Sequence, residues 1–294
     1  MSGAQLFRKI EEIREMLARV RRMGATVGFV PTMGALHDGH GRLIDLARRE
    51  TDCVVVSVFV NPIQFDRKDD LEKYPRNLDA DLKFCTERRA DLVFAPPVEE
   101  MYPEEPKTFV EVRGVSDGLC GAFRPGHFRG VATVVLKLFH IVEPHRAYFG
   151  EKDAQQLAVI RRMVRDLNLT VEIVPVPTVR ESDGLALSSR NQRLSPEERR
   201  IAPVLFQALL VAQKYIAAGE TDPAAVKAAA QAVLERQPAL RVEYLEVVDP
   251  DEMQPVGRIN GPVRVAAAAW LGSTRLIDNL LCEPGADPEV RMIQ

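Results

Sequence analysis

Short apolar segments rich in β-branched residues alternate with longer helical patterns through the first 180 residues of this 294-residue chain. The strand-like segments are TVGFVP (26–31), CVVVSVFV (53–60), DLVFAP (91–96), RAYFG (146–150) and VEIVPVP (171–177). Between them, segments such as RLIDLARRE and KDAQQLAVIRRMVRDLN place apolar residues at helical spacing. Strands that alternate with helices of this length predict a parallel sheet, and the continuous apolarity of the strands predicts helices on both faces. The predicted fold class is therefore α/β, with a Rossmann-like parallel sheet.

The pattern changes after about residue 180. Residues 181–195 are polar, and Ser195 followed by proline is typical of a helix N-terminus. Two helical segments, at 196–218 and 223–236, precede the strand-like runs VEYLEVV, VRVAAAAWLG and TRLIDNL. This order of elements predicts a small α+β region rather than a continuation of the parallel sheet.

Chain length and this change of pattern together predict two domains, since domains average about 150 residues. We expect a Rossmann-like catalytic domain over residues 1–180 and a smaller α+β C-terminal domain over residues 181–294. No Gly/Ser linker separates them, so we expect the two domains to pack together, with the second covering the active site.

Composition narrows the class of function. The net charge of −3 and the pI near 6.0 lack the positive charge that nucleic-acid-binding proteins use. We therefore expect a small molecule as the partner. The four cysteines are scattered without metal-ligand spacing, as in a reduced cytosolic protein. The opening MSGAQLFRKIEEIREML has helical periodicity and charges throughout, unlike a signal peptide. Because no apolar run is long enough to cross a membrane, we expect a cytoplasmic protein.

Ligands of open α/β sheets bind beyond the carboxyl ends of the strands. The segments that follow the predicted strands are TMGALHDGHG, NPIQF, the residues after FAPP, GEKDAQQ and TVRESDGLALSSRN. Four of these five are unusually rich in polar side chains, so we expect the site to be built from them.

The segment VPTMGALHDGHG contains two histidines, His37 and His40, among closely spaced glycines. Gly34 and Gly39 have the spacing of a P-loop, but His40 stands where that loop has lysine, and no G-x-G-x-x-G is present. His-x-x-His can chelate zinc, yet no third ligand lies nearby at chelating spacing. The segment must therefore be judged by its position between a strand and a helix.

A helix that begins at about Asp38–His40 places both imidazoles at a helix N-terminus. Backbone N–H groups and the helix dipole favour an anion there, and the imidazoles can donate hydrogen bonds to phosphate oxygens. Gly39 leaves room for a base or ribose against the backbone. An ordinary strand–helix turn with two exposed histidines is the alternative, but it does not explain histidines and glycines together.

The other loops have weaker signals, each with an ordinary structural alternative. Asn61 and Gln64 offer amides for hydroxyls or a carboxylate, or form an Asn-Pro turn. RPGHFRG (124–130) suits an anion or is an exposed basic turn. Lys152 can reach phosphates, and Asp153 is either a ribose-hydroxyl acceptor or an ordinary N-terminal helix residue.

LALSSRN (185–191) completes the set, with two hydroxyls and an arginine that suit a polyphosphate or a solvated connection between domains. His, Lys, Ser and Arg side chains thus gather in sheet-end loops with few opposing carboxylates. GxSxG, paired catalytic carboxylates and an evident cysteine nucleophile are all missing from the sequence; Cys120, near His127, is typical of a small buried hydrophobe. These features predict nucleotide transfer by electrostatic stabilisation rather than covalent catalysis.

Five motifs in order, VPTMGALHDGH, FVNPIQF, RPGHFRG, YFGEKDAQQL and VPTVRESDGLALSSRN, resemble the pantothenate synthetase (pantoate–β-alanine ligase) family over about residues 25–195. The HxGH element also resembles the HIGH-type signature of the wider nucleotidyltransferase superfamily. The resemblance implies an ATP-dependent ligase that condenses pantoate with β-alanine through a pantoyl adenylate, releasing AMP and pyrophosphate. It further implies that Mg²⁺ accompanies ATP and that the protein forms a homodimer. We expect neither nucleic acid nor a membrane as a partner.

The same resemblance assigns roles to matching residues. It implies catalysis by His37, His40 and Lys152; ATP binding by Met33, His37, Gly39, His40, Gly150, Lys152, Asp153, Ser188, Ser189 and Arg190; pantoate and β-alanine binding by Asn61, Gln64, Arg124, His127 and Gln156; and Mg²⁺ coordination by Asp81. One departure stands out: Gly41 and Arg42 follow His40, where the family more commonly has apolar residues. Glycine within a helix costs about 1 kcal/mol relative to alanine, so we expect a looser first turn.

Two other functions stay open from the sequence. One is another small-molecule nucleotidyltransferase of the same superfamily, which stops at nucleotidyl transfer. The other is a non-catalytic nucleotide-binding module or an RNA-binding relative of the synthetases. The acidic balance argues against RNA, and the retention of His37, His40 and Lys152 argues against an inactive site.

Overall fold

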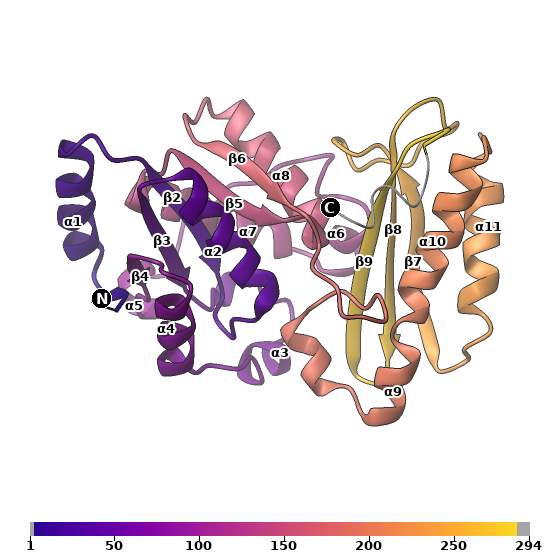
Figure 1. The fold of residues 1–294 in the computed structure, drawn as a ribbon, viewed down its shortest axis with the longest axis horizontal. Coiled ribbons are helices and arrows are strands. Elements are labelled where there is room, and N and C mark those ends of the chain that lie inside the picture. The colour runs from indigo at the N-terminus through magenta and orange to yellow at the C-terminus, as the bar shows by residue number, and fades with distance from the viewer. Residues whose placement is uncertain (1–2, 287–294) are drawn as a thin grey trace. The chain divides into compact units, whose positions relative to one another are not determined.

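The computed structural model describes residues 3–286, and the chain forms two compact units (Figure 1). Unit 1 consists of Met1–Val112, Arg124–Glu151 and Val159–Val176, and unit 2 of Arg113–Phe123, Lys152–Ala158 and Pro177–Gln294. Two short segments before residue 180 thus belong to unit 2. Residues 287–294, assigned to the second domain from the sequence, lie outside the described residues.

Unit 1 contains a six-stranded sheet in the order β1-β4-β3-β2-β5-β6. The strands are β1 (Gln5–Phe7), β2 (Val27–Thr32), β3 (Cys53–Val58), β4 (Leu92–Phe94), β5 (Arg146–Gly150) and β6 (Glu172–Val176). Every neighbouring pair is parallel, which confirms the α/β prediction. All five strands expected from the sequence are present, and their ends lie close to the predicted ones.

The sixth strand, β1, was not predicted. Gln5–Phe7 lies in the opening segment expected to be helical, and helix α1 begins only at Ile10. β1 pairs with β4 in the register Leu6 to Val93. A strand of three residues is too short to show a period of two, and the periodicity of the adjoining helix dominates the window.

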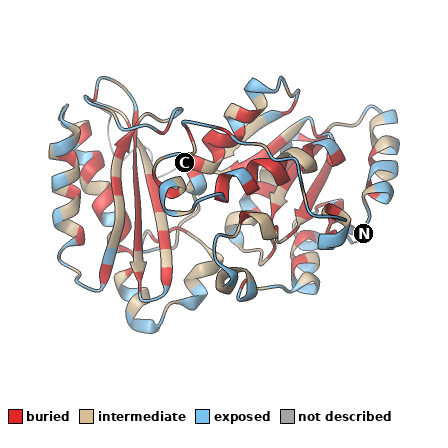
Figure 2. Cartoon of the chain, turned by 180° about the vertical axis from the view of Figure 1, so that it is seen from behind, coloured by how far each residue is buried: buried red, intermediate tan, exposed pale blue. Residues whose placement is uncertain are grey.

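Helices cover both faces of this sheet because successive strand residues point to opposite sides. The helical elements before β6 are α1 (Ile10–Arg22), α2 (Asp38–Glu50), η1 (Pro62–Gln64), α3 (Lys68–Glu72), α4 (Leu78–Glu87), α5 (Val98–Met101), α6 (Cys120–Phe123), α7 (His127–Val142), η2 (Glu151–Asp153) and α8 (Ala154–Asp166). Val30 of β2 is buried in one cluster with Leu43 and Ile44 of α2. Its neighbour Phe29 meets Phe139 of α7 edge to face, with 6.4 Å between ring centroids, on the other side. The sheet is buried between these layers (Figure 2).

Unit 2 contains a three-stranded antiparallel sheet, β7-β8-β9, and its own core. Its strands are β7 (Leu240–Val248), β8 (Val263–Leu271) and β9 (Thr274–Cys282), and its later helices are η3 (Ser189–Arg193), α9 (Pro196–Ile201), α10 (Val204–Ala217) and α11 (Pro223–Leu234). The α+β prediction is confirmed, but the helix expected at 196–218 is two helices. The break falls at Pro203, which lacks the N–H that a continuous helix needs.

The strand order creates a topological switch point between β2 and β5. From β2 the chain moves to β3 and β4 on one side, and it later returns through β5 and β6 on the other. The carboxyl ends of β2 and β5 are therefore adjacent in unit 1, where open α/β sheets bind ligands. The segment containing His37 and His40 follows β2, and Gly150 ends β5.

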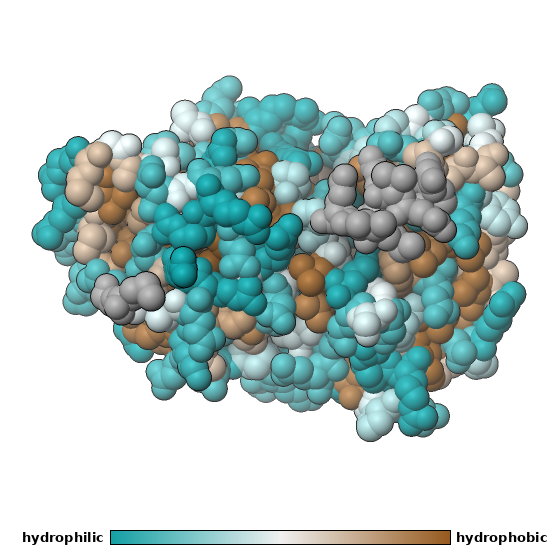
Figure 3. Space-filling model, viewed as in Figure 1, coloured by the Kyte–Doolittle hydropathy of each residue, from teal (hydrophilic) through white to brown (hydrophobic). Residues whose placement is uncertain are grey.

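Hydrophilic side chains cover most of the surface drawn in Figure 3, with hydrophobic ones in small separate groups. Within residues 3–286, no helix combines the length and the apolar character needed to cross a membrane.

Candidate active site

The turn between β2 and α2 brings the two histidines of VPTMGALHDGHG into ring contact. Helix α2 begins at Asp38, where the sequence predicted it, with His37 as its N-cap. Nδ1 of His37 accepts the N–H of Gly39 at 3.1 Å, and Nδ1 of His40 accepts the N–H of His37 at 3.3 Å. The ring centroids lie 4.1 Å apart. Because each Nδ1 acts as an acceptor, the neutral form of each ring carries its proton on Nε2.

Asp81 lies under this turn. Its side chain is buried, and Oδ2 accepts the N–H of Ala35 at 3.1 Å while Oδ1 accepts that of Leu36 at 2.8 Å. Burial raises the pKa of the Asp81 carboxyl, and the two backbone hydrogen bonds oppose that shift. Gly34 makes the approach possible, since a Cβ there would lie 2.8 Å from Oδ2.

Asn61 and Gln64 also belong to a connected set of side chains. They lie at the end of β3 and in η1, both buried, and Nδ2 of Asn61 donates to Oε1 of Gln64 at 3.0 Å. The same nitrogen donates to the carbonyl of Gly130 at 3.1 Å. Nε2 of Gln64 lies 2.9 Å from Sδ of Met33, which connects the amide pair to the histidine turn.

Arg124 and His127 join this set from the start of α7. Nε of Arg124 donates to Oδ1 of Asp66 at 3.0 Å. Nη1 of the same guanidinium lies 3.2 Å from Nε2 of His127. Nδ1 of His127 lies 2.8 Å from the carbonyl of Gln64. An arginine always donates, so Nε2 accepts and Nδ1–H donates, which makes His127 a neutral ring that holds η1.

Tyr102 completes the network, and the sequence did not identify it. Its hydroxyl donates to Oδ1 of Asn61 at 2.9 Å. The residues after FAPP were recognised as a sheet-end loop, but none of them was assigned to the site. The signal was only one tyrosine in that loop, too weak to separate from an ordinary surface residue.

The remaining candidate residues belong to unit 2, except Gly150, which ends β5 in unit 1. Lys152 and Asp153 lie in η2, with Nζ of Lys152 3.6 Å from Oδ1 of Asp153. Nδ2 of Asn279 on β9 donates to the carbonyl of Lys152 at 2.9 Å. Gln156 is half-buried on α8, while Gln155 is buried and donates to the carbonyls of residues 115 and 118.

Ser188, Ser189 and Arg190 form the start of η3, and β9 contacts this segment too. Oγ of Ser188 accepts the N–H of Arg190 at 3.3 Å as a helix cap. Just upstream, Arg180 binds both carboxylate oxygens of the buried Asp278, at 2.6 and 2.9 Å. Strand β9 therefore supports both the Lys152 segment and the LALSSRN segment within unit 2.

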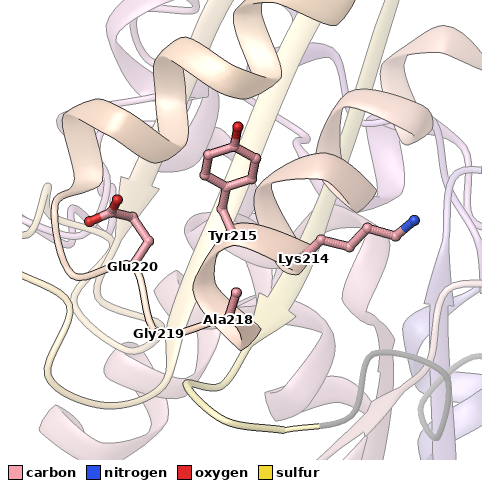
Figure 4. Close-up of a pocket in the computed structure, with 5 residues that line it drawn as sticks. All are labelled: Lys214, Tyr215, Ala218, Gly219 and Glu220. Carbon is pink, nitrogen blue, oxygen red and sulfur yellow. The ribbon is translucent and has the colours of Figure 1, made fainter.

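A surface pocket of about 540 Å³ lies elsewhere, at the end of α10. Figure 4 shows that its side chains, among them Lys214, Tyr215 and Glu220, point in different directions. None of the residues predicted for the site lines it, and nothing in it converges on a ligand.

Comparison with known proteins agrees with the five motifs. The family model described as Pantoate-beta-alanine ligase matches residues 5–281. Pantothenate synthetase of Thermotoga neapolitana is 52% identical over 277 residues, covering 94% of this chain and 99% of that protein. Pantothenate synthetase of Aquifex aeolicus is 52% identical over 275 residues, covering 93% and 97%.

Solved structures agree as well. The crystal structure of pantothenate synthetase from Thermus thermophilus has a TM-score of 0.89 at 50% identity, covering 94% of this chain and 98% of that one. Pantoate-beta-alanine ligase from Francisella tularensis, complexed with beta-gamma ATP and beta-alanine, has a TM-score of 0.80 at 32% identity, covering 97% and 100%. Matches of this length and identity leave one assignment: the chain belongs to the pantoate–β-alanine ligase family.

Proposed function

We propose that this ligase condenses pantoate with β-alanine through a pantoyl adenylate, with ATP as the second substrate of the first step. A pantoate carboxylate oxygen attacks the α-phosphorus of ATP, a new O–P bond forms, and pyrophosphate leaves. The β-alanine amine then attacks the carbonyl carbon of the adenylate, an amide forms, AMP leaves, and the amine loses its proton. Family membership supports the overall reaction.

The histidine turn is the observation that carries the first step. His37 and His40 stand at the N-terminus of α2, after the strand that borders the switch point, and both present Nε2–H as donor. Donors held at a helix start stabilise the negative charge that develops on a transferring phosphoryl group. Because each ring is fixed through Nδ1 to the backbone, it needs no reorganisation when that charge develops.

We assign the polar network of unit 1 to the acid and amine substrates. Gln64 binds the pantoate hydroxyls and carboxylate, and Asn61 places β-alanine, as the resemblance implied. Their burial and mutual hydrogen bonds support fixed amide orientations. His127 holds the backbone of η1 at Gln64, and Arg124 in turn holds the ring of His127.

In unit 2, Lys152, Ser188, Ser189 and Arg190 hold the phosphates and Asp153 the ribose, while Gln156 contributes to pantoate. In unit 1, the backbone at Met33, Gly39 and Gly150 contacts the nucleotide in this proposal. The support for these roles is the matching motifs and the common attachment of the two segments to β9.

Mg²⁺ accompanies ATP in this proposal and screens phosphate charge when bound. Among residues 3–286, no group of three or more His, Cys, Asp or Glu side chains is arranged to hold a metal ion. Both oxygens of Asp81 accept backbone N–H groups, and its role as an outer ligand of the ion stays a prediction. When bound, the ion would be held mostly by phosphate oxygens and water, as is usual for Mg²⁺. We also propose that the protein is a cytoplasmic homodimer, and this part rests on the family resemblance alone.

AMP release tests the reaction directly. We expect AMP from ATP only when pantoate and β-alanine are both present, and pyrophosphate from pantoate alone in a single turnover. With oxygen-18 in the pantoate carboxylate, label must appear in AMP, and its absence there excludes the adenylate route. If β-alanine leaves turnover unchanged, the chain is a nucleotidyltransferase that stops after the first step.

A further inference from the structure

Helix α4 and its C-cap make two contacts near His37 and His40, one with the turn between β2 and α2 and one with α2 itself, and the proposed chemistry uses neither. We infer that Asp81 and Arg88, near the two ends of α4, are positioning residues that hold the turn 33–36 and the first turns of α2. They thereby fix where His37 and His40 present their imidazoles. The inference rests on the proposed role of those histidines, but its first measurement below does not depend on catalysis.

The turn itself has a backbone that needs outside support. Gly34 and Ala35 are consecutive residues in the left-handed region, with φ of 80° and 52°. Alanine is disfavoured in that region, and such conformations persist where surrounding contacts hold them. Two N–H groups of this turn, those of Ala35 and Leu36, point to the Asp81 carboxylate rather than to backbone acceptors.

Asp81 suits this task because an ionised carboxylate accepts on both oxygens. Hydrogen bonds to an ionised acceptor are stronger than neutral ones, and burial strengthens them further. The first turn of α4 is itself capped, since Oδ1 of Asn77 accepts the N–H of Ala80 at 3.1 Å. The capped first turn of α4 therefore places the Asp81 carboxylate against the loop that precedes His37.

Arg88 makes the second contact, at the other end of α4. Nη2 donates to Oδ1 of Asp38 at 2.7 Å, and Nη1 donates to Oδ2 of Asp45 at 2.6 Å. Asp38 opens α2 and Asp45 lies about two turns later, so one guanidinium spans the segment that contains His40. Gly41 makes room for it, since a Cβ there would lie 2.8 Å from Cζ of Arg88.

Asp81→Asn tests the first contact. The amide offers one acceptor and one donor in place of two acceptors, so either the Ala35 or the Leu36 N–H loses its partner in any rotamer. Asp79→Asn is the matched control: it removes the same charge from the same helix turn, but Asp79 is exposed.

We expect faster amide hydrogen exchange in segment 33–37 for Asp81→Asn and no change for Asp79→Asn. We also expect kcat to fall by up to about 100-fold, because a displacement of about 1 Å can cost that much. KM for β-alanine and the Mg²⁺ concentration for half-maximal activity should stay within about twofold, since neither ligand touches the contact under test. A shifted Mg²⁺ requirement with unchanged exchange would instead make Asp81 a metal ligand and overturn the inference.

Arg88→Gln tests the second contact, with Arg89→Gln as its exposed neighbour control. We expect a several-fold lower kcat, faster exchange over 38–42, and partial rescue by Arg88→Lys, which reaches one carboxylate only. This variant also carries the test if Asp81→Asn fails to fold. Exchange that rises with no loss of kcat in either variant would refute the positioning role, whereas a fully active His40→Ala would refute the proposed role of the histidines instead.

Discussion

The hydroxyl of Tyr102 donates a hydrogen bond to Oδ1 of Asn61, with 2.9 Å between the oxygens. The amide orientation is fixed by the carbonyl of Gly130, which can only accept and so requires Nδ2 of Asn61 on its side, while the Tyr102 hydroxyl donates to Oδ1 on the other. Nδ2 then points to Gln64 and to the carbonyl of Gly130. Two residues far from the histidines in the sequence thus determine what the proposed β-alanine site presents.

Tyr102→Phe removes that donor and leaves the shape nearly unchanged. A buried acceptor that loses its partner costs about 1–3 kcal/mol, so we expect KM for β-alanine to rise about tenfold. KM for ATP should stay unchanged. Steady-state kinetics of AMP release measure both, and Tyr215→Phe, which removes an exposed hydroxyl from α10, is the control. An equal rise in both KM values would contradict a specific effect on Asn61.

His40→Ala removes one donor from the proposed phosphate site. We expect kcat/KM to fall by a factor that corresponds to about 2.7–4 kcal/mol, the cost of losing one donor aimed at a developing negative charge. ATP affinity, measured by calorimetry, should change much less. The control is His140→Ala, an exposed histidine on α7. Activity that survives in His40→Ala would mean that the role assignment is wrong.

Gly130→Ala introduces a methyl group where two backbone segments meet. The added Cβ would lie 2.5 Å from the carbonyl oxygen of Ile63 and 2.6 Å from Cα of Gln64, and neither can rotate away. We expect the free energy of unfolding to fall by about 1–3 kcal/mol, together with a loss of activity as η1 shifts. Urea unfolding measures the first effect. Gly257→Ala, with no atom within 4 Å of the added Cβ, should be silent.

Gly41→Ala should separate stability from activity. Alanine gains about 1 kcal/mol of helix propensity, but its Cβ displaces the Arg88 guanidinium, whose partly exposed ion pairs are each worth about 0–1 kcal/mol. We therefore expect a thermal midpoint close to that of the parent and a lower kcat. A normal kcat would show that Arg88 does not constrain α2.

Cys53 and Cys85 should resist thiol reagents in the folded protein. Burial raises the pKa of each thiol to about 12. Both therefore stay protonated at about pH 8, where iodoacetamide labelling followed by mass spectrometry should find them unmodified until urea is added. The unfolded thiols ionise near pH 9, so their contribution to stability is complete below that pH and is lost as the pH rises toward 12. Urea midpoints should thus fall between about pH 9 and about pH 11.

The expectation of a loose first turn in α2 was reasonable from the sequence, because Gly41 is unfavourable in an isolated helix. The structure explains why a glycine stands at this position: Gly41 is buried, and a Cβ there would collide with the Arg88 guanidinium. In the same way, Asp81 was expected to bind a metal because the family resemblance implied it. That role stays a prediction, and the structure adds that both carboxylate oxygens accept N–H groups, from Ala35 and Leu36.

Local patterns in the amino-acid sequence were enough to predict the parallel sheet, the α+β region after it and the segments that hold the candidate residues. Those features depend on periodicity and on motifs within short windows, where each residue's neighbours are known. Three contacts became evident only in the folded chain: Tyr102 with Asn61, Arg88 across the start of α2, and β1 with β4. Each of these contacts joins residues that are far apart along the chain, and local sequence carries no signal for which distant side chain will meet a given hydrogen-bonding group.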